Sequence, residues 1–95
     1  MIFEWDPYKA VNNRLKHGVS FEQASYVFTD RHNITIYDVE HSENEPRWIT
    51  IGQVHANILV VVHTYPHETN DNTIRIISAR LATAKERAYY KEGAS

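Results

Sequence analysis

A set of cationic and imidazole side chains is spaced along this chain in a way that suits chemistry on a phosphodiester. The set comprises Lys16, His17, Arg47, His63, Arg75 and Arg80. RNA cleavage without a metal needs a base near the 2′-hydroxyl, cations around the five-coordinate phosphorus, and an acid for the departing 5′-oxygen. Histidine, arginine, lysine, tyrosine and glutamate can supply these roles between them. We therefore expect an anionic substrate at some of these residues.

The region from Thr73 to Tyr90 concentrates this chemistry. It begins as an apolar strand that carries Arg75, leaves that strand through Ser78-Ala79-Arg80, and restarts as a helix after Thr83. From residue 75 to residue 92 there are five cations and two acids, a net charge of +3 in a chain whose net charge is −2. A strand that delivers arginines beside a basic helix start is a favourable place for an anion.

The spacing of the two arginines sets a geometric condition. Arg75 and Arg80 are five residues apart, so a straight strand would place them on opposite faces of a sheet. They converge only if the chain bends or leaves the sheet near Ser78. The alternative is that both arginines are exposed and pair with acids, while His17 merely ends a helix.

Two further residues of this region have two interpretations each. Glu86 could act as an acid or base, or it could complete a capping box with Thr83, which we favour. Tyr90, with its neighbour Tyr89, could stack on a base or bind a phosphate, or one of the two could pack on the sheet.

The sequence predicts no metal site and no cofactor. His63 and His67 are four apart, but Pro66 lies between them and prevents a helical ligand pair. There is no HExxH motif and no cysteine, so neither a common zinc pattern nor a disulfide is present.

Local signals predict the elements that position these residues. The expected elements are a strand at Ile2–Trp5, a helix at Pro7–His17 capped by Asp6 and ended by Gly18, a second helix after a Ser20–Gln23 capping box, four strands that start near Ile34, Arg47, Ile58 and Thr73, and a final helix after Thr83. The first helix should turn Ala10 and Leu15 inward, and Gly52 should mark a bulge. Polar segments His41–Pro46 and Tyr65–Asn72 are expected loops, and His55-Ala56-Asn57 a hairpin turn.

This order predicts one α+β domain over residues 1–95. Its sheet should be mostly antiparallel with about five strands, and two N-terminal helices and one C-terminal helix should pack on it. The hydrophobic fraction of 42% and charged fraction of 23% are typical of a globular chain. The start of the chain does not have the form of a signal peptide, and the apolar run Ile58–Val62 is too short to span a bilayer. We expect a cytoplasmic protein without a membrane partner.

Several ordered motifs resemble the BrnT family of bacterial type II toxins. They are FEWDPYKAVNNRLKHGVSFEQASYVFTD, WITIG, LVVVHTY and IRIISARLATAKERAYY, of which Asn13–Phe21 and Arg75–Arg87 are the most specific. The resemblance implies a RelE-like fold and a growth-slowing ribonuclease. It also implies a BrnA-type antitoxin with a ribbon-helix-helix domain, which would mask the toxin and alone contact the DNA of the shared operon. A toxin homodimer within that complex is a further implication.

The resemblance also assigns residues. Lys16-His17 match the family's KHG, Arg75 and Arg80 match its two late arginines, and Glu45-Pro46-Arg47-Trp48 matches an E-x-R-W pattern. The final helix has Ala88 where the family often has a second arginine. We expect Arg75, Arg80, His17 and Glu86 to be catalytic, and Lys16, Arg47 and Tyr90 to contact RNA.

Two other functions remain open at this stage. A non-catalytic module for antitoxin binding and autoregulation is favoured by the net charge of −2 and by the missing helix arginine. A metal-dependent nuclease is the other alternative.

Overall fold

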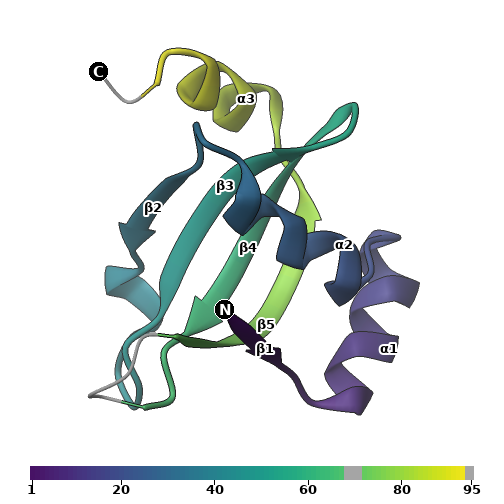
Figure 1. The fold of residues 1–95 in the computed structure, drawn as a ribbon, viewed down its shortest axis with the longest axis vertical. Helices are drawn as coiled ribbons and strands as arrows, with labels where there is room; N and C mark the ends of the chain where they lie inside the picture. The colour runs from purple at the N-terminus through teal and green to yellow at the C-terminus, as the bar shows by residue number, and fades with distance from the viewer. Residues whose placement is uncertain (68–71, 94–95) are drawn as a thin grey trace.

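The computed structural model, which describes residues 1–67 and 72–93, contains one five-stranded sheet with the strand order β1-β5-β4-β3-β2 (Figure 1). The elements are β1 (Ile2–Glu4), α1 (Pro7–His17), α2 (Phe21–Ser25), the 3-10 helix η1 (Tyr26–Thr29), β2 (Ile34–Tyr37), the 3-10 helix η2 (Val39–His41), β3 (Trp48–Val54), β4 (Asn57–Thr64), β5 (Thr73–Leu81) and α3 (Ala84–Lys91). β1 pairs with β5 in parallel, and the other pairs are antiparallel. The expected α+β class and element order are confirmed. Part of the expected loop Tyr65–Asn72 and the end of the chain lie outside the described residues.

Each helix begins where the sequence places a cap. The Asp6 carboxylate accepts the Tyr8 N–H at 2.8 Å, and Gly18 ends α1 with a φ of 71°. Capping boxes are present at Ser20–Gln23 before α2 and at Thr83–Glu86 before α3. Side chains that satisfy the free N–H groups of the first turn therefore fix all three helix starts.

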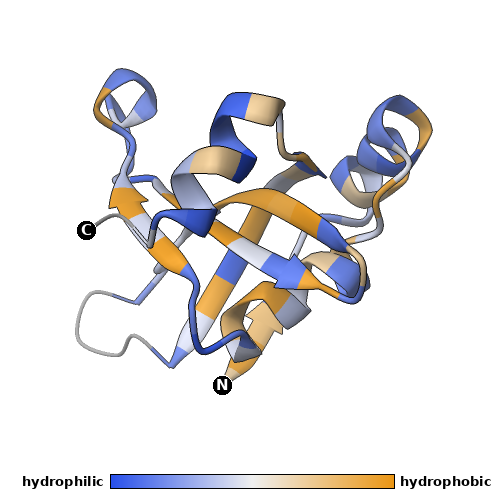
Figure 2. Ribbon diagram, turned by 90° about the horizontal axis from the view of Figure 1, so that it is seen from above, coloured by the Kyte–Doolittle hydropathy of each residue, from blue (hydrophilic) through white to orange (hydrophobic). Residues whose placement is uncertain are grey.

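One face of the sheet is covered by α2 and η1. Phe21, Ala24 and Val27 are buried there against Val61 of β4 and Ile76 of β5. Gly52 does not mark a bulge, contrary to expectation. A Cβ at Gly52 would lie 2.9 Å from the Val27 Cβ, so the residue is small because a helix approaches the strand closely. In Figure 2 the strands are predominantly hydrophobic, as expected for a core centred on the sheet.

The helix α1 contacts the sheet in a different way. Its only buried residue is Asn13, whose side-chain amide donates to the Ala79 carbonyl at 2.8 Å and accepts the Ala79 N–H at 3.1 Å. Within the described residues, β1 pairs only with residues 73–75 of β5. Further along β5, at Ala79, the Asn13 amide therefore makes the backbone hydrogen bonds that a neighbouring strand would otherwise make. The inward orientation expected of Leu15 is wrong, because a helix held at the sheet edge by Asn13 leaves Leu15 81% exposed.

The strand β5 contains an irregularity that changes which way its side chains point. Val62 of β4 pairs with Ser78, whereas the next residue, His63, pairs with Ile76, so Ile77 is the extra residue of a β-bulge. As a result, Arg75 and Arg80 lie opposite Thr64 and Val60, which are on the same face of β4. This is the face on which α3 packs, at the end that includes Val60 and Tyr90.

Candidate functional site

The two late arginines share a face of the sheet but not a site. The bulge supplies the irregularity near Ser78 that the sequence required. Arg75 and Arg80 nevertheless remain on the order of 15 Å apart along the strand, given a rise of about 3.3 Å per residue. Each also binds different carboxylates, so the two guanidinium groups do not converge on one phosphate.

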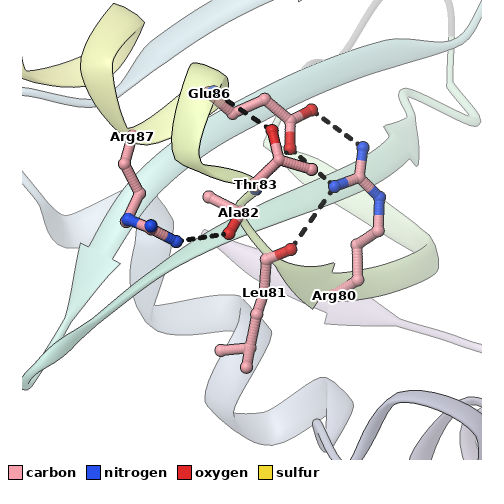
Figure 3. Close-up of polar contacts among 6 residues, drawn as sticks. All are labelled: Arg80, Leu81, Ala82, Thr83, Glu86 and Arg87. Atoms are coloured by element: carbon pink, nitrogen blue, oxygen red, sulfur yellow. Dashed lines mark hydrogen bonds and ion pairs between the residues drawn. The ribbon is translucent and has the colours of Figure 1, made fainter.

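Arg80 joins the end of β5 to α3 (Figure 3). Its Nη1 and Nη2 donate to Glu86 Oε1 and Oε2 at 2.7 and 2.8 Å, and Nη1 also lies 3.4 Å from the Leu81 carbonyl oxygen. Glu86 accepts the Thr83 N–H at 2.8 Å as well. The hydrogen bond from Arg80 is the main reason that the pKa of Glu86 falls to about 2, and the same bond raises the pKa of Arg80. Glu86 therefore stays ionised near neutral pH, where it anchors the helix and holds no proton.

Arg75 lies at the other end of β5, and its partners come from β1 and from a loop. Its Nε and Nη2 donate to Glu4 Oε2 at 3.3 and 3.2 Å. Its Nη1 is 3.9 Å from Glu45 Oε2, which is beyond hydrogen-bond distance. The Arg75 side chain remains 39% exposed. Glu4 thus orients a guanidinium group whose Nη1 edge is loosely held.

The segment that leads from β2 through η2 to β3 is closed into a compact loop. The Asp38 N–H donates to the Arg47 carbonyl at 2.9 Å. Ser42 Oγ donates to the Asp38 carbonyl at 2.6 Å and accepts the Arg47 N–H at 2.9 Å. These bonds fix the two ends of the loop against each other.

This loop holds an aspartate–histidine pair. His41 Nδ1 lies 3.2 and 3.1 Å from Asp38 Oδ1 and Oδ2, and Asp38 is buried whereas His41 is exposed. The pocket beside the pair is lined by Glu40, His41, Glu43, Asn44, Glu45 and Arg47. Because Glu45 also approaches Arg75, the pair, Arg47 and Arg75 form one continuous group, which we call the loop-end cluster.

The sequence hypothesis placed His17 beside the arginines, and the structure does not bring it to Arg75. His17 lines a pocket at the β3–β4 turn with residues that include Val54, His55, Leu59 and Leu81. Asn13 fixes α1 to β5 at Ala79, and this directs the end of the helix toward that turn. Lys16 follows its neighbour to the same end of the sheet.

Tyr90, expected to contact RNA, is buried in the core instead. Its hydroxyl donates to the Asp30 carboxylate, and burial followed by this hydrogen bond raises the pKa of Tyr90 to about 12. Burial alone would raise the pKa of Asp30, but hydrogen bonds from the Gln53 N–H, Tyr90 and the His32 N–H lower it overall. The pair fixes α3 against the body of the protein, so the packing interpretation of Tyr90 is the one that the structure supports.

His63 also belongs to the core. Its Nε2 is 2.7 Å from Thr50 Oγ1, and the rings of Phe28 and Tyr65 meet it edge-on. Burial lowers the pKa of His63 to about 4. Over residues 1–67 and 72–93, no group of three or more histidine and acidic side chains is placed to hold a metal ion. In the same residues, no helix is both long and apolar enough to cross a membrane.

Sequence reasoning missed Asp38 and His41. The only signal was an aspartate three residues before a histidine, just ahead of a polar segment. Such spacing becomes informative only when the residues between the two are known to form a helical turn, as at η2, where Asp38 is the N-cap and His41 the last residue.

Comparison with known proteins supplies the family. A family model described as the ribonuclease toxin BrnT of the type II toxin-antitoxin system matches residues 5–86. That span begins just after β1 and contains every later element as far as the start of α3. The search of curated proteins gave no match.

Proposed function

Since this chain belongs to the BrnT family of ribonuclease toxins, we propose that it is a metal-independent endoribonuclease whose active centre is the loop-end cluster. The 2′-hydroxyl of a ribose would attack the adjacent phosphorus, and the bond to the 5′-oxygen would break. The products would be a 2′,3′-cyclic phosphate and a 5′-hydroxyl.

The observation that carries this proposal is the setting of Arg75. Glu4 holds its Nε and Nη2, while Nη1 faces Glu45 at a distance too long for a hydrogen bond. A phosphate oxygen that replaces Glu45 could accept from Nη1 without breaking the bonds that orient the side chain. Arg47 lines the adjoining pocket and would supply a second cation for the phosphorane.

The remaining expected residues receive other roles. Arg80 and Glu86 would act by holding α3 in place. Lys16 and His17 would bind phosphates further along the RNA. In support, the lining of the His17 pocket, and that of the neighbouring pocket with Arg87 and Lys91, includes no acidic residue.

Type II toxin-antitoxin membership means that the chain has an antitoxin partner. We propose that this partner is a BrnA-type protein with a ribbon-helix-helix domain, and that the toxin contacts DNA only through it. We also propose that two toxin chains meet in the complex.

One observation favours a second candidate, a non-catalytic module that binds the antitoxin and regulates transcription. Arg75 and Arg80 are both already close to carboxylates, which compete with RNA for the guanidinium groups.

A cleavage assay with the purified chain distinguishes the candidates. The chain is incubated with end-labelled single-stranded RNA in EDTA, and the product ends are identified. The proposal expects cleavage with cyclic phosphate ends, together with growth arrest when the chain is expressed alone. A binding module would give neither result, and a metal nuclease would lose its cleavage in EDTA.

A further inference from the structure

We propose that His41, positioned by Asp38, is the proton carrier of the cleavage reaction. This inference rests on the proposed ribonuclease function, and it names the general base that the proposed active centre still lacks. The loop-end cluster contains cations for the phosphate, but a reaction of this kind also needs a group that takes the proton of the 2′-hydroxyl.

The contact with Asp38 determines which nitrogen of His41 is available. A carboxylate only accepts hydrogen bonds, so Nδ1, at 3.1 and 3.2 Å from the Asp38 oxygens, carries the hydrogen. In the neutral imidazole, Nε2 then holds a lone pair. A buried carboxylate that orients an exposed imidazole is the arrangement by which a histidine is held in the tautomer that serves as a base.

The loop that carries the pair is held in shape by its own bonds. Ser42 links the Asp38 carbonyl to the Arg47 N–H, and the Asp38 N–H donates to the Arg47 carbonyl. The pair therefore sits at a fixed place beside Arg47, whose side chain lines the same pocket. An imidazole next to a cation that can bind phosphate is the combination that the cleavage requires.

Charged groups of both signs surround His41. Asp38 is bound to it, and the pocket beside it is lined by Glu40, Glu43, Glu45 and Arg47. RNA that binds at Arg47 and Arg75 would bring a phosphate next to the imidazole, where the proton transfer takes place.

The step can be written in full. His41 Nε2 takes the proton of the 2′-hydroxyl as the bond from O2′ to phosphorus forms. The bond from phosphorus to O5′ breaks, and the 5′-oxygen takes a proton from water. The imidazolium then returns its proton to the hydroxide that remains, so no net proton is gained or lost.

Four of the other five histidines lie away from the loop-end cluster. His63 is fully buried in the core, and His17 and His55 line the pocket at the β3–β4 turn. His32 is exposed, and its backbone N–H donates to Asp30 just after η1. It lines neither the pocket of the loop-end cluster nor the pocket at the β3–β4 turn. It is a suitable control.

The test measures RNA cleavage in EDTA as a function of pH for the full chain and four variants. We expect His41→Gln to lower the rate by about 100-fold or more, and Asp38→Asn by roughly 10-fold. In wild type, the rate should fall on the acid side as a histidine becomes protonated, and His41→Gln should lose this acid limb. His32→Gln should keep both the rate and the limb. Added imidazole should restore part of the activity of His41→Gly.

The outcomes separate this inference from the proposed function. If wild type does not cleave RNA, the proposed function fails and the role of His41 fails with it. If wild type cleaves and folded His41→Gln keeps the wild-type rate and acid limb, the ribonuclease stands and the inference is overturned. Circular dichroism of each variant shows whether it folds. If Asp38→Asn does not fold, imidazole rescue of His41→Gly decides whether His41 carries the proton.

Discussion

Arg75 and Arg80 lie on the same strand and the same face, and each is paired with a glutamate, yet their surroundings differ in kind. Both oxygens of Glu86 are taken up by Arg80, and Glu86 also caps α3. Glu4 offers one oxygen to Arg75, at longer distances, and Glu45 is further away still. The number of bonds that each carboxylate makes therefore distinguishes an arginine that holds the fold from one that can exchange its partner for a substrate.

The strongest way to break this comparison is to remove each arginine in turn. We expect Arg75→Ala to lower RNA cleavage by about 100-fold or more, as loss of a charge-stabilising group does in other enzymes. Arg80→Ala should retain the cleavage rate per folded molecule within about 5-fold, because its partner Glu86 lies in α3 and not in the loop-end cluster. The measurement is the single-turnover cleavage rate, normalised to the folded fraction.

Growth arrest on expression provides a parallel readout for the same two variants. A folded Arg80→Ala protein that has lost all toxicity, beside a toxic Arg75→Ala protein, would reverse the roles assigned to the two arginines.

Between pH 6.5 and 4, the stability of the protein should depend mainly on the buried His63 rather than on the Arg75 or Arg80 ion pair. The pKa of His63 is about 4 in the fold and near its ordinary value of 6.5 in the unfolded chain. The unfolded chain therefore binds a proton first, and the free energy of unfolding should decrease by up to about 3 kcal/mol as pH falls from 6.5 to 4. Urea unfolding at several pH values checks this, and His63→Gln should abolish the decrease in that interval while Arg75→Ala retains it.

The smallest expected effect is on the free energy of unfolding when either glutamate partner, Glu86 or Glu4, is neutralised. Glu86→Gln should lower the free energy of unfolding at pH 7 by about 1 kcal/mol, and Glu4→Gln by only a few tenths, because the Glu4–Arg75 pair is more exposed. The pKa of Glu86 is about 2 in the fold, against an ordinary value of 4.5. Its contribution is thus present above pH 4.5 and lost as pH falls toward 2. Equal losses for the two variants at pH 7 would contradict the distinction.

The elements of the fold could be predicted from sequence because their signals are local. The start of each α-helix is marked by a capping motif of four residues or fewer, at Asp6-Pro7, Ser20–Gln23 and Thr83–Glu86. Alternation of apolar residues located the strands. The orientation of Leu15 failed because it depends on how α1 meets an edge of the sheet, a fact set by the distant pair Asn13 and Ala79.

The candidate site was only partly predictable, for a related reason. Arg75 and Arg47 could be chosen as candidates from the sequence, because an arginine near the end of a strand suggests by its charge that an anion binds there. The bulge at Ile77, which decides the face of Arg75 and Arg80, appears only in the register of β4 against β5. The partnership of Asp38 with His41 likewise needed the closed loop, because a polar segment of that composition is consistent with many conformations.

The amide of Asn13 has a consequence for how this protein can associate. A bare strand edge invites another chain to extend the sheet, which is a common route to polymers and amyloid. Here one side-chain amide occupies both hydrogen-bonding groups of Ala79, so an incoming strand cannot run along β5 past that residue. Any protein that approaches from this side meets the outer surface of a helix, where recognition depends on side chains and not on backbone pairing.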